Sequence, residues 1–384
     1  MQERLHTWPA ASPGTRRELL SLHYGAASKP EHGAPRAPKA YIQCALHADE
    51  IPAMLVGAHL RSHLSRLEEQ GAIEGEIVLV PMANPIGLSQ EALGHHIGRF
   101  HLGSGVNFNR GYRHLTADLQ TALSGQWSSS DAAHNTQLIR SQCRAILQQW
   151  TPSDEAQALK KVLQLLAIDA DVVLDLHCDG QALMHLYAGT PLLTQAQGLA
   201  RELQAQAVLL ARESGDDPFD ESVSRHWWEL QEQLAPQAPI DLACFSATVE
   251  LRGQSDVTHE WAEHDAQGIL RFLQQAGHLN ARAQLSNPGS GAQTPEATPL
   301  EGVDPITAPM AGVVLFGAQL GQRIEAGQTI GEVLDPLSGH TEPLISRVSG
   351  ILFARSATRY AFRGERVAKI AGAKPFRTGK LLSA

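Results

Sequence analysis

Two side chains that commonly bind metal ions follow an apolar segment at residues 41–46. His47 and Glu50 stand where this segment ends and a helical pattern begins. A neutral imidazole and a carboxylate at a strand-to-helix turn can face one cleft, and they are two of the three protein ligands of a His₂Glu catalytic zinc site. Because such a pair is also common as ordinary polar residues at the end of a strand, the metal interpretation depends on partners elsewhere in the chain.

An imidazole and a carboxylate stand at the ends of two more apolar segments later in the chain. His177 ends one such segment and Glu250 ends another. Ligands of open α/β sheets bind beyond the carboxyl ends of the strands, so we expect all four side chains to share one pocket. In that pocket the two histidines and Glu50 would bind zinc. Glu250 would serve as a general base towards water and as an acid towards a departing amine.

The alternation of side chains along a strand adds a supporting group. Asp175 lies two residues before His177 and therefore on the same side of its strand, where it can accept the second ring N–H of that histidine. Cys44 and Cys178 are alternative thiolate ligands beside the ligand strands. Cys44 is three residues before His47, so the alternation along a strand points the two side chains to opposite faces. Buried free cysteines usually behave as small apolar residues.

An arginine is the other component that amide hydrolysis would use. A guanidinium can pair with a substrate carboxylate or polarise a scissile carbonyl. Arg110 follows a glycine-containing approach within a long loop and is the first candidate, and Arg99 and Arg252 are further ones. A solvated surface arginine is the alternative for Arg99 and Arg110.

Apolar segments and helical spacing alternate along most of the chain. A strand, a helix and a strand within the first 84 residues form a βαβ unit, which predicts an α/β fold with a mixed, largely parallel sheet flanked by helices. Residues 25–38 and 86–134 are predicted to be loops. The predicted strands are 17–24, 41–47, 75–84, 171–180, 183–187 and 243–253, and the predicted helices are 50–69, 135–150, 154–168, 191–212, 221–234 and 258–276.

Composition excludes several classes of protein. The 384 residues are 43% hydrophobic and 18% charged, which is typical of a globular chain. The net charge of −9 without a basic block disfavours nucleic acid as a partner. Four scattered cysteines argue against a disulfide framework and fit a reducing compartment. With no long apolar segment and no leader-like N-terminus, we expect a soluble cytoplasmic protein that has no contact with membranes.

The domain organisation follows from a change in composition near residue 280. We expect a zinc hydrolase domain over 1–280, a linker rich in Gly, Ser, Pro and Thr over 281–308, and a small all-β module over 309–384. Short strands separated by glycine turns define the module.

Five short motifs occur in a fixed order along the chain: His47-Ala-Asp-Glu50, Asn84-Pro85, Asn109-Arg110, Asp175-Leu-His177 and Val249-Glu250-Leu-Arg252. Together they resemble the succinylglutamate desuccinylase/aspartoacylase family, a branch of the zinc carboxypeptidase-like fold. The similarity runs over about residues 15–275 and implies a mixed eight-stranded sheet. Two positions depart from the family pattern, with Ala48 where glycine is usual and Asn107 where an acidic residue is frequent.

The resemblance also implies a reaction and roles for individual residues. One zinc ion per chain would be bound by the two histidines and Glu50, with Glu250 promoting water, and the reaction would hydrolyse an N-acyl amino acid to a carboxylate and an amine. Asn109 and Arg110 would hold the substrate carboxylate. Arg99 would polarise the scissile carbonyl, although its spacing from the Asn-Arg pair is longer than the family pattern.

The C-terminal module resembles a lipoyl/biotinyl-type β-sandwich in its Gly-x-x-Ile-x-x-Gly rhythm. The hairpin at residues 335–343 contains no lysine that could carry a prosthetic group. We therefore expect a structural module that shields the cleft or supports a homo-oligomer.

Three functions follow from these patterns. The first is zinc-dependent deacylation of a small N-acyl amino acid. The second is a zinc carboxypeptidase that acts on short peptides with the same metal site. The third is a non-catalytic protein that binds a small molecule or a partner on a hydrolase scaffold.

Overall fold

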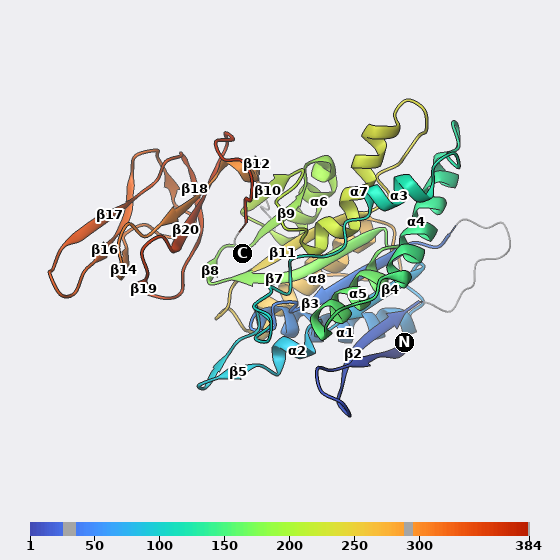
Figure 1. Ribbon diagram of the computed structural model, residues 1–384, viewed down its shortest axis with the longest axis horizontal. Coiled ribbons are helices and arrows are strands. Elements are labelled where there is room, and N and C mark those ends of the chain that lie inside the picture. The colour runs from blue at the N-terminus through green and yellow to red at the C-terminus, as the bar shows by residue number, and fades with distance from the viewer. Residues whose placement is uncertain (26–35, 288–294, 383–384) are drawn as a thin grey trace.

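A mixed β-sheet forms the centre of the protein, with helices on both of its faces (Figure 1). The computed structural model describes residues 1–25, 36–287 and 295–382. Neighbouring strands are parallel in five of the eight pairings on this sheet, which confirms the predicted fold class. Within the described residues the sheet has nine strands, in the order β1 (Gln2–Pro9), β2 (Arg16–Tyr24), β4 (Glu76–Val80), β3 (Lys39–Cys44), β7 (Val172–Asp179), β11 (Phe245–Gly253), β9 (His185–Gly189), β10 (Ala207–Ala211) and β12 (Ala297–Pro299).

Alternate residues of the central strands pack into two separate apolar cores. Ile42 of β3 and Leu174 of β7 belong to one core, whereas Tyr41 and Val173 belong to the other. Since successive side chains of a strand point to opposite faces, a strand covered on both faces reads as a continuous apolar segment. This is why the strands that carry the site were recognisable in the sequence.

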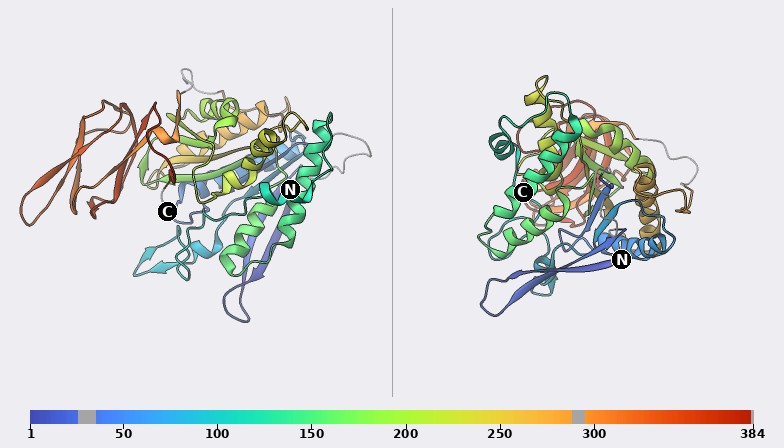
Figure 2. Two further views of the ribbon diagram at one scale, coloured as in Figure 1. Left: turned by 45° about the horizontal axis from the view of Figure 1, so that its top comes forward. Right: turned by 90° about the vertical axis from the view of Figure 1, so that its right-hand side faces the viewer.

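Two groups of helices cover the two faces of the sheet (Figures 1 and 2). The first core includes residues of α1 (Pro52–Glu69), α6 (Leu193–Leu203) and α8 (His259–Gln275). The second includes residues of α3 (Thr116–Ala122), α4 (Ala132–Gln149), α5 (Glu155–Ala167) and α7 (Phe219–Leu234). Among the described residues, no helix is both long enough and apolar enough to cross a lipid bilayer.

One predicted helix is partly wrong. Residues 191–212 contain a 3₁₀ turn (Thr190–Leu192) and then α6, but 207–211 form β10. Gln204 ends the helix in a left-handed conformation, with φ of 54°. A short apolar segment that is buried on both faces cannot be distinguished from a buried helix by periodicity alone. The edge strand β1, which is mostly exposed, also lacks an apolar pattern and was not predicted.

The predicted loop at residues 86–134 contains short regular elements. These are the end of α2 (Pro85–Leu88), the hairpin of β5 (Glu91–Ala92) and β6 (His95–His96), α3, and the start of α4. In the loop predicted at 25–38, residues 26–35 lie outside the described part of the chain.

The C-terminal part of the chain folds as two small sheets. One has the order β13 (Val303–Thr307), β20 (Arg366–Gly372), β18 (Gly350–Arg355) and β15 (Arg323–Ile324), and β8 (Gln181–Ala182) pairs with β18. The other has the order β17 (Thr341–Ile345), β16 (Thr329–Leu334), β14 (Gly312–Phe316) and β19 (Tyr360–Ala361).

Two strands fall within the segment predicted to be a linker. β12 pairs with β10 and provides a ninth strand to the central sheet, where the resemblance implied eight, and β13 already belongs to the C-terminal sheets. A 3₁₀ turn (Leu300–Gly302) connects them. Residues 288–294 of the predicted linker lie outside the described chain.

The C-terminal sheets pack directly on one end of the central sheet (Figure 1). An apolar cluster joins Tyr187 and Leu209 of the large sheet to Phe353 of β18. A salt bridge between Lys369 of β20 and Asp179 of β7 adds a polar contact. These contacts place side chains from both parts of the chain beside the carboxyl ends of the central strands.

The packing at this junction can be tested with Phe353, which is fully buried and contacts the ring of His185 with 4.9 Å between ring centroids. Phe353→Ala should lower the free energy of unfolding by about 3–5 kcal/mol, because it removes buried apolar surface and leaves a cavity. Urea denaturation of the full chain measures this. The matched control is Phe362, which is 71% exposed in the same C-terminal part, and its replacement by alanine should cost less than about 0.5 kcal/mol. Equal losses in the two variants would contradict the packing described here.

Candidate metal centre

The turn after β3 brings His47 and Glu50 to the end of the central sheet. β3 ends at Cys44, and Ala45 then adopts φ of 56°, which bends the chain sharply. The Asn84 side chain donates from Nδ2 to the Leu46 carbonyl at 2.8 Å and accepts from the Gly87 N–H at 2.8 Å, so it joins this turn to α2. His47 therefore lies in the turn rather than at the end of the predicted strand.

Gly98 supports the same turn from the opposite side. Its carbonyl accepts from the Ala48 N–H at 3.1 Å, and a Cβ added at Gly98 would lie 2.1 Å from the Asp49 backbone nitrogen. Only glycine allows the backbone to approach this closely. The conformation of the residues between the two ligands thus depends on the loop that follows α2.

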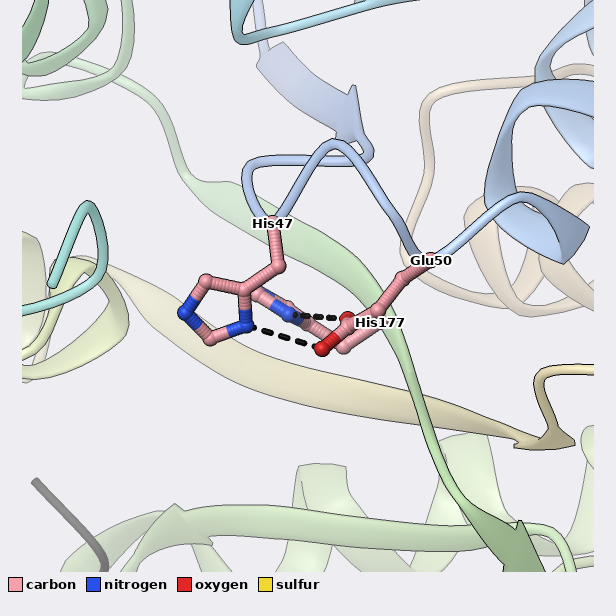
Figure 3. A group of neighbouring side chains, drawn as sticks. All are labelled: His47, Glu50 and His177. Carbon is pink, nitrogen blue, oxygen red and sulfur yellow. Dashed lines mark hydrogen bonds and ion pairs between the residues drawn. The ribbon is translucent and has the colours of Figure 1, made fainter. Parts of the chain in front are cut away.

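Glu50 lies between the two histidines and contacts both (Figure 3). Its Oε1 is 2.8 Å from His47 Nδ1, and its Oε2 is 2.7 Å from His177 Nδ1. One donor atom from each residue lies within 4.8 Å of the others, and all three side chains are buried. The Cys178 N–H also donates to Glu50 Oε2 at 3.1 Å, which fixes the carboxylate against β7.

The hydrogen bonds around His47 indicate which ring nitrogen is available to a metal ion. Asn107 Oδ1 accepts from the Asn109 backbone N–H at 2.8 Å and lies 2.8 Å from His47 Nε2, so Nε2 carries the proton. Burial and the neighbouring Arg99 guanidinium lower the pKa of His47 to about 4, which leaves the ring neutral at pH 7. His47 Nδ1 then has a lone pair directed at the Glu50 carboxylate.

The second histidine has the same arrangement on β7. His177 Nε2 donates to Asp175 Oδ2 at 2.9 Å, and Asp175 Oδ1 accepts from Gln43 Nε2 at 2.9 Å. Burial opposes protonation of His177, but Asp175 and Glu50 raise its pKa well above the ordinary value. Each imidazole thus has its outer nitrogen held by an oxygen and its inner nitrogen facing Glu50, which is the usual arrangement of metal-binding histidines.

This set of donors fits a divalent cation such as zinc. Burial raises the pKa of Glu50, but the two histidines outweigh it and hold the pKa well below its ordinary value, so the group stays a carboxylate. Arg99 Nη1 lies 3.2 Å from His47 Nδ1 and 3.4 Å from Glu50 Oε1, so its guanidinium contacts two of the three groups. Two imidazoles and one carboxylate leave a fourth position for water or substrate.

The loop at residues 99–110 places several predicted residues together. The Phe108 N–H donates to the Arg99 carbonyl at 3.1 Å, and the buried Phe108 ring anchors the loop in the second core. Lys160 of α5 donates to the carbonyls of Arg110 at 2.6 Å and Asn107 at 3.4 Å. Burial lowers the pKa of Lys160 to about 8. Asn109 Oδ1 accepts from the Phe219 N–H at 2.8 Å, which ties the loop to α7.

Glu250 lies beside the candidate metal ligands, on the strand next to that of His177. It is opposite His177 in the parallel register of β11 and β7. Its Oε2 is buried, with no hydrogen-bond partner among the described residues. Burial, followed by the charges of Glu50 and Asp179, raises the pKa of Glu250 to about 8. A buried carboxyl group with an unsatisfied oxygen is suited to contact water or a ligand.

A cavity of about 880 Å³, its opening included, connects these groups. That volume is typical of small-molecule sites, which range over about 300–1,000 Å³. The part of the chain before residue 280 contributes His47, His177, Glu250, Arg99, Asn109, Arg110 and Asp220, and the C-terminal part contributes Leu300, Arg366, Lys369, Arg377 and Leu381.

Two of the lining residues, Asp220 and Lys369, could not be predicted from the sequence. Burial and the nearby Glu221 and Asp175 carboxylates raise the pKa of Asp220 to about 7. Lys369 lies nearly two hundred residues after His177 in the chain, outside every motif. Asn107 stood out only as a departure from a family pattern, whereas its contact with His47 could not be read from the sequence.

Arg252 is not among the residues that line the cavity, and its role as a substrate-binding residue stays a prediction. Its guanidinium pairs with Asp265 of α8 and lies 4.2 Å from the centre of the Trp261 ring. Alternation would place Arg252 on the side of Glu250, but the register shifts between Glu250 and Gly253, and Arg252 has φ of 64°. A β-bulge of this kind redirects side chains.

The two cysteines next to the ligand strands are not among the grouped metal donors. Burial and the nearby Asp175 carboxylate raise the pKa of Cys44, and burial followed by Glu50 raises that of Cys178. Both therefore remain thiols near neutral pH.

Comparison with known proteins identifies what this arrangement resembles. The model of the succinylglutamate desuccinylase/aspartoacylase catalytic domain matches residues 36–276. A crystal structure of a family protein from Shewanella amazonensis is 23% identical, with a TM-score of 0.81 over 97% of this chain and 98% of that one. A second, from Shewanella frigidimarina, is 24% identical, with a TM-score of 0.80 over 97% of each chain.

A more distant structural neighbour is the ectoine utilization protein EutE from Ruegeria pomeroyi. It is 13% identical, with a TM-score of 0.66 over 97% of this chain and 94% of that one. No curated protein matches the chain. The structural likenesses extend through the C-terminal sheets, so the whole architecture is shared.

The contact between Asn107 and His47 predicts an effect on metal binding. Asn107→Ala should weaken zinc binding about 10–100-fold, because His47 Nε2 loses the acceptor that orients the ring. Asn107→Asp keeps an acceptor oxygen and is the matched control, with an affinity close to that of the unchanged protein. Competition with a chromogenic chelator measures both. Equal affinities for the alanine variant and the unchanged protein would contradict this role.

The raised pKa of Glu250 predicts a pH dependence of stability in the metal-free protein. Its pKa is about 8 in the folded chain, against an ordinary value of 4.5, so between these pH values the folded state holds the proton that the unfolded state has lost. The free energy of unfolding contributed by this group therefore falls as pH rises from 4.5 to 8. In calorimetry, the Tm of Glu250→Gln minus the Tm of the unchanged protein should increase as the pH is raised from 5 to 8. If this difference in Tm were the same at every pH, Glu250 would not be protonated in the folded chain and its pKa would not be raised.

Proposed function

This chain belongs to the succinylglutamate desuccinylase/aspartoacylase family, and from that premise we propose that it is a zinc-dependent deacylase of a small N-acyl amino acid. The family is one of amide hydrolases. The observation that carries the proposal is the buried His47–Glu50–His177 group, which opens into a cavity that Glu250 and four arginines also line.

The proposed metal ligands are His47 Nδ1, His177 Nδ1 and the Glu50 carboxylate. Zinc held there would polarise the substrate carbonyl and make hydroxide available near neutral pH. Asn107 and Asp175 accept from the opposite ring nitrogens and so orient the Nδ1 atom of each ring towards Glu50.

Glu250 is the proposed general base and acid. Its carboxylate accepts a proton from the attacking water, whose oxygen bonds to the amide carbon. When the C–N bond breaks, Glu250 delivers that proton to the leaving nitrogen, and the products are a carboxylate and an amine. A pKa raised by burial suits both halves of this transfer, because a group poised near the working pH can accept and release a proton.

The arginines and Asn109 are proposed to position the substrate. Arg99 reaches the edge of the metal ligands, where it could donate to the oxyanion that develops on the amide oxygen. Arg110 and the Nδ2 group of Asn109 could bind the substrate carboxylate, since a guanidinium pairs with a carboxylate through two parallel hydrogen bonds.

Charge and enclosure favour a small anionic substrate over a peptide. Arg366, Lys369 and Arg377 of the C-terminal part line the cavity together with Arg99 and Arg110. The cavity is also lined by three acidic residues, Asp220, Glu221 and Glu250, so the cationic side chains are in excess, which suits a substrate with a carboxylate. A carboxypeptidase would need room for a peptide chain in the region where the C-terminal side chains lie, so we favour the deacylase.

The role of Glu250 can be tested by separating metal binding from turnover. Glu250→Gln should retain about one zinc ion at the His47–Glu50–His177 group while losing about 10²–10⁴-fold in kcat, because the amide cannot accept a proton. Glu260→Gln, at an exposed position at the start of α8, is the matched control and should keep full activity. Near-normal turnover by the Glu250 variant would remove it from the mechanism.

The substrate class can be tested by a screen of zinc-loaded protein. Acetyl-, succinyl- and other N-acyl amino acids are compared with short peptides by following the release of primary amine. We expect kcat/KM to be higher for N-acyl amino acids that carry a free carboxylate. Faster hydrolysis of peptides would support the carboxypeptidase instead.

A further inference from the structure

A second group of metal-binding side chains lies on two helices away from the cavity. His59 and His63 are four residues apart on α1, and His259 and Glu263 are four residues apart on α8. Residues at this spacing lie on one face of a helix. Because α1 and α8 pack side by side on the same face of the sheet, the two pairs meet (Figure 1). None of the four lines the cavity.

Glu263 lies between the two histidines of α1, as Glu50 does in the candidate metal centre. His59 Nδ1 is 2.8 Å from Glu263 Oε2, and His63 Nε2 is 2.9 Å from both carboxylate oxygens. One donor atom of each residue lies within 4.8 Å of the others. Burial opposes ionisation of Glu263, but hydrogen bonds from His63, His59 and Gln267 outweigh it and lower its pKa to about 2.

Neighbouring side chains hold two of these donors in place. His259 Nδ1 lies 3.0 Å from His59 Nε2, so it contacts the ring nitrogen that does not face Glu263. Gln267 donates from Nε2 to Glu263 Oε1 at 3.0 Å. Metal-binding groups usually have such outer partners, which fix their orientation. The arrangement therefore has positioned donors as well as the right residue types.

We propose that this helix pair holds a second divalent transition-metal ion, of the zinc, cobalt and nickel class. The ligands are His59 Nδ1, His63 Nε2 and the Glu263 carboxylate, with water in the remaining positions because the side chains are 20%, 12% and 44% exposed. Two imidazoles and one carboxylate suit these borderline ions better than calcium or magnesium.

The ion would link α1 to α8, because it has ligands on both helices. α1 begins two residues after Glu50, and α8 follows the strand that carries Glu250, so both helices are continuous with the candidate metal centre. A link between them would stabilise the folded chain, because the ion binds the folded state and the ligand helices separate on unfolding. The proposal stands independently of the reaction at the cavity.

Replacement of Arg66 should strengthen metal binding at this group, whereas loss of a ligand weakens it. Its guanidinium donates to His63 Nδ1 at 3.0 Å, which keeps the ring proton on Nε2 and opposes a metal ion there. Arg66 is exposed and can turn away. Arg66→Ala should therefore tighten binding at this group, whereas His259→Ala, which removes the partner of His59, should weaken it about 10–100-fold.

The experiment is a calorimetric titration of the metal-free full chain with zinc chloride, with bound zinc counted by elemental analysis after gel filtration. The unchanged protein should bind two ions per chain, and His63→Ala should bind one. His134→Ala, which removes an exposed histidine of α4, is the matched control and should still bind two. His59→Ala gives an independent test should His63→Ala fold poorly.

The outcomes also separate this site from the candidate metal centre. With His47→Ala the remaining ion should still raise the Tm, and this rise should disappear when His63→Ala is added. If the unchanged protein binds one ion that His63→Ala removes, the second site stands and the proposed function fails. If His63→Ala and His59→Ala bind as many ions as the unchanged protein, the second site is refuted.

Discussion

The shared contact of one buried carboxylate with two imidazole nitrogens is the constraint on which the candidate active site depends. Glu50 lies within 2.8 Å of an inner nitrogen of both His47 and His177, and all three residues are buried. A buried charge is costly unless it is paired, so this geometry is stable only with a proton or a metal ion among the three groups. Asn107 holds the proton of His47 on the opposite side of the ring, which favours the metal ion at that histidine.

The C-terminal sheets are part of this site as well as part of the fold. Lys369 pairs with Asp179 just beyond His177, and Arg366 and Arg377 face the same cavity. The charge and size of the pocket are thus set by two stretches of chain that are far apart in sequence. Because these C-terminal residues are not among the candidate metal ligands, changes in them would alter the pocket and leave that set of donors intact.

The sequence was informative wherever a function depends on local geometry, and uninformative where it depends on distant contacts. His177 and Asp175 could be paired because a buried strand alternates strictly, and parallel strands bring their ends to one edge of the sheet. The alternation does not extend to Arg252, because a bulge after Glu250 interrupts it. The contact of Asn107 with His47 joins segments sixty residues apart, and no periodic pattern reports such a contact.

Anomalous diffraction from crystals of the full chain grown with zinc, recorded on both sides of the zinc absorption edge, would locate a bound zinc ion. We expect an anomalous peak within about 2.3 Å of His47 Nδ1, His177 Nδ1 and an oxygen of Glu50. Zinc peaks found only elsewhere in such crystals, with none among these three side chains, would contradict the candidate metal centre.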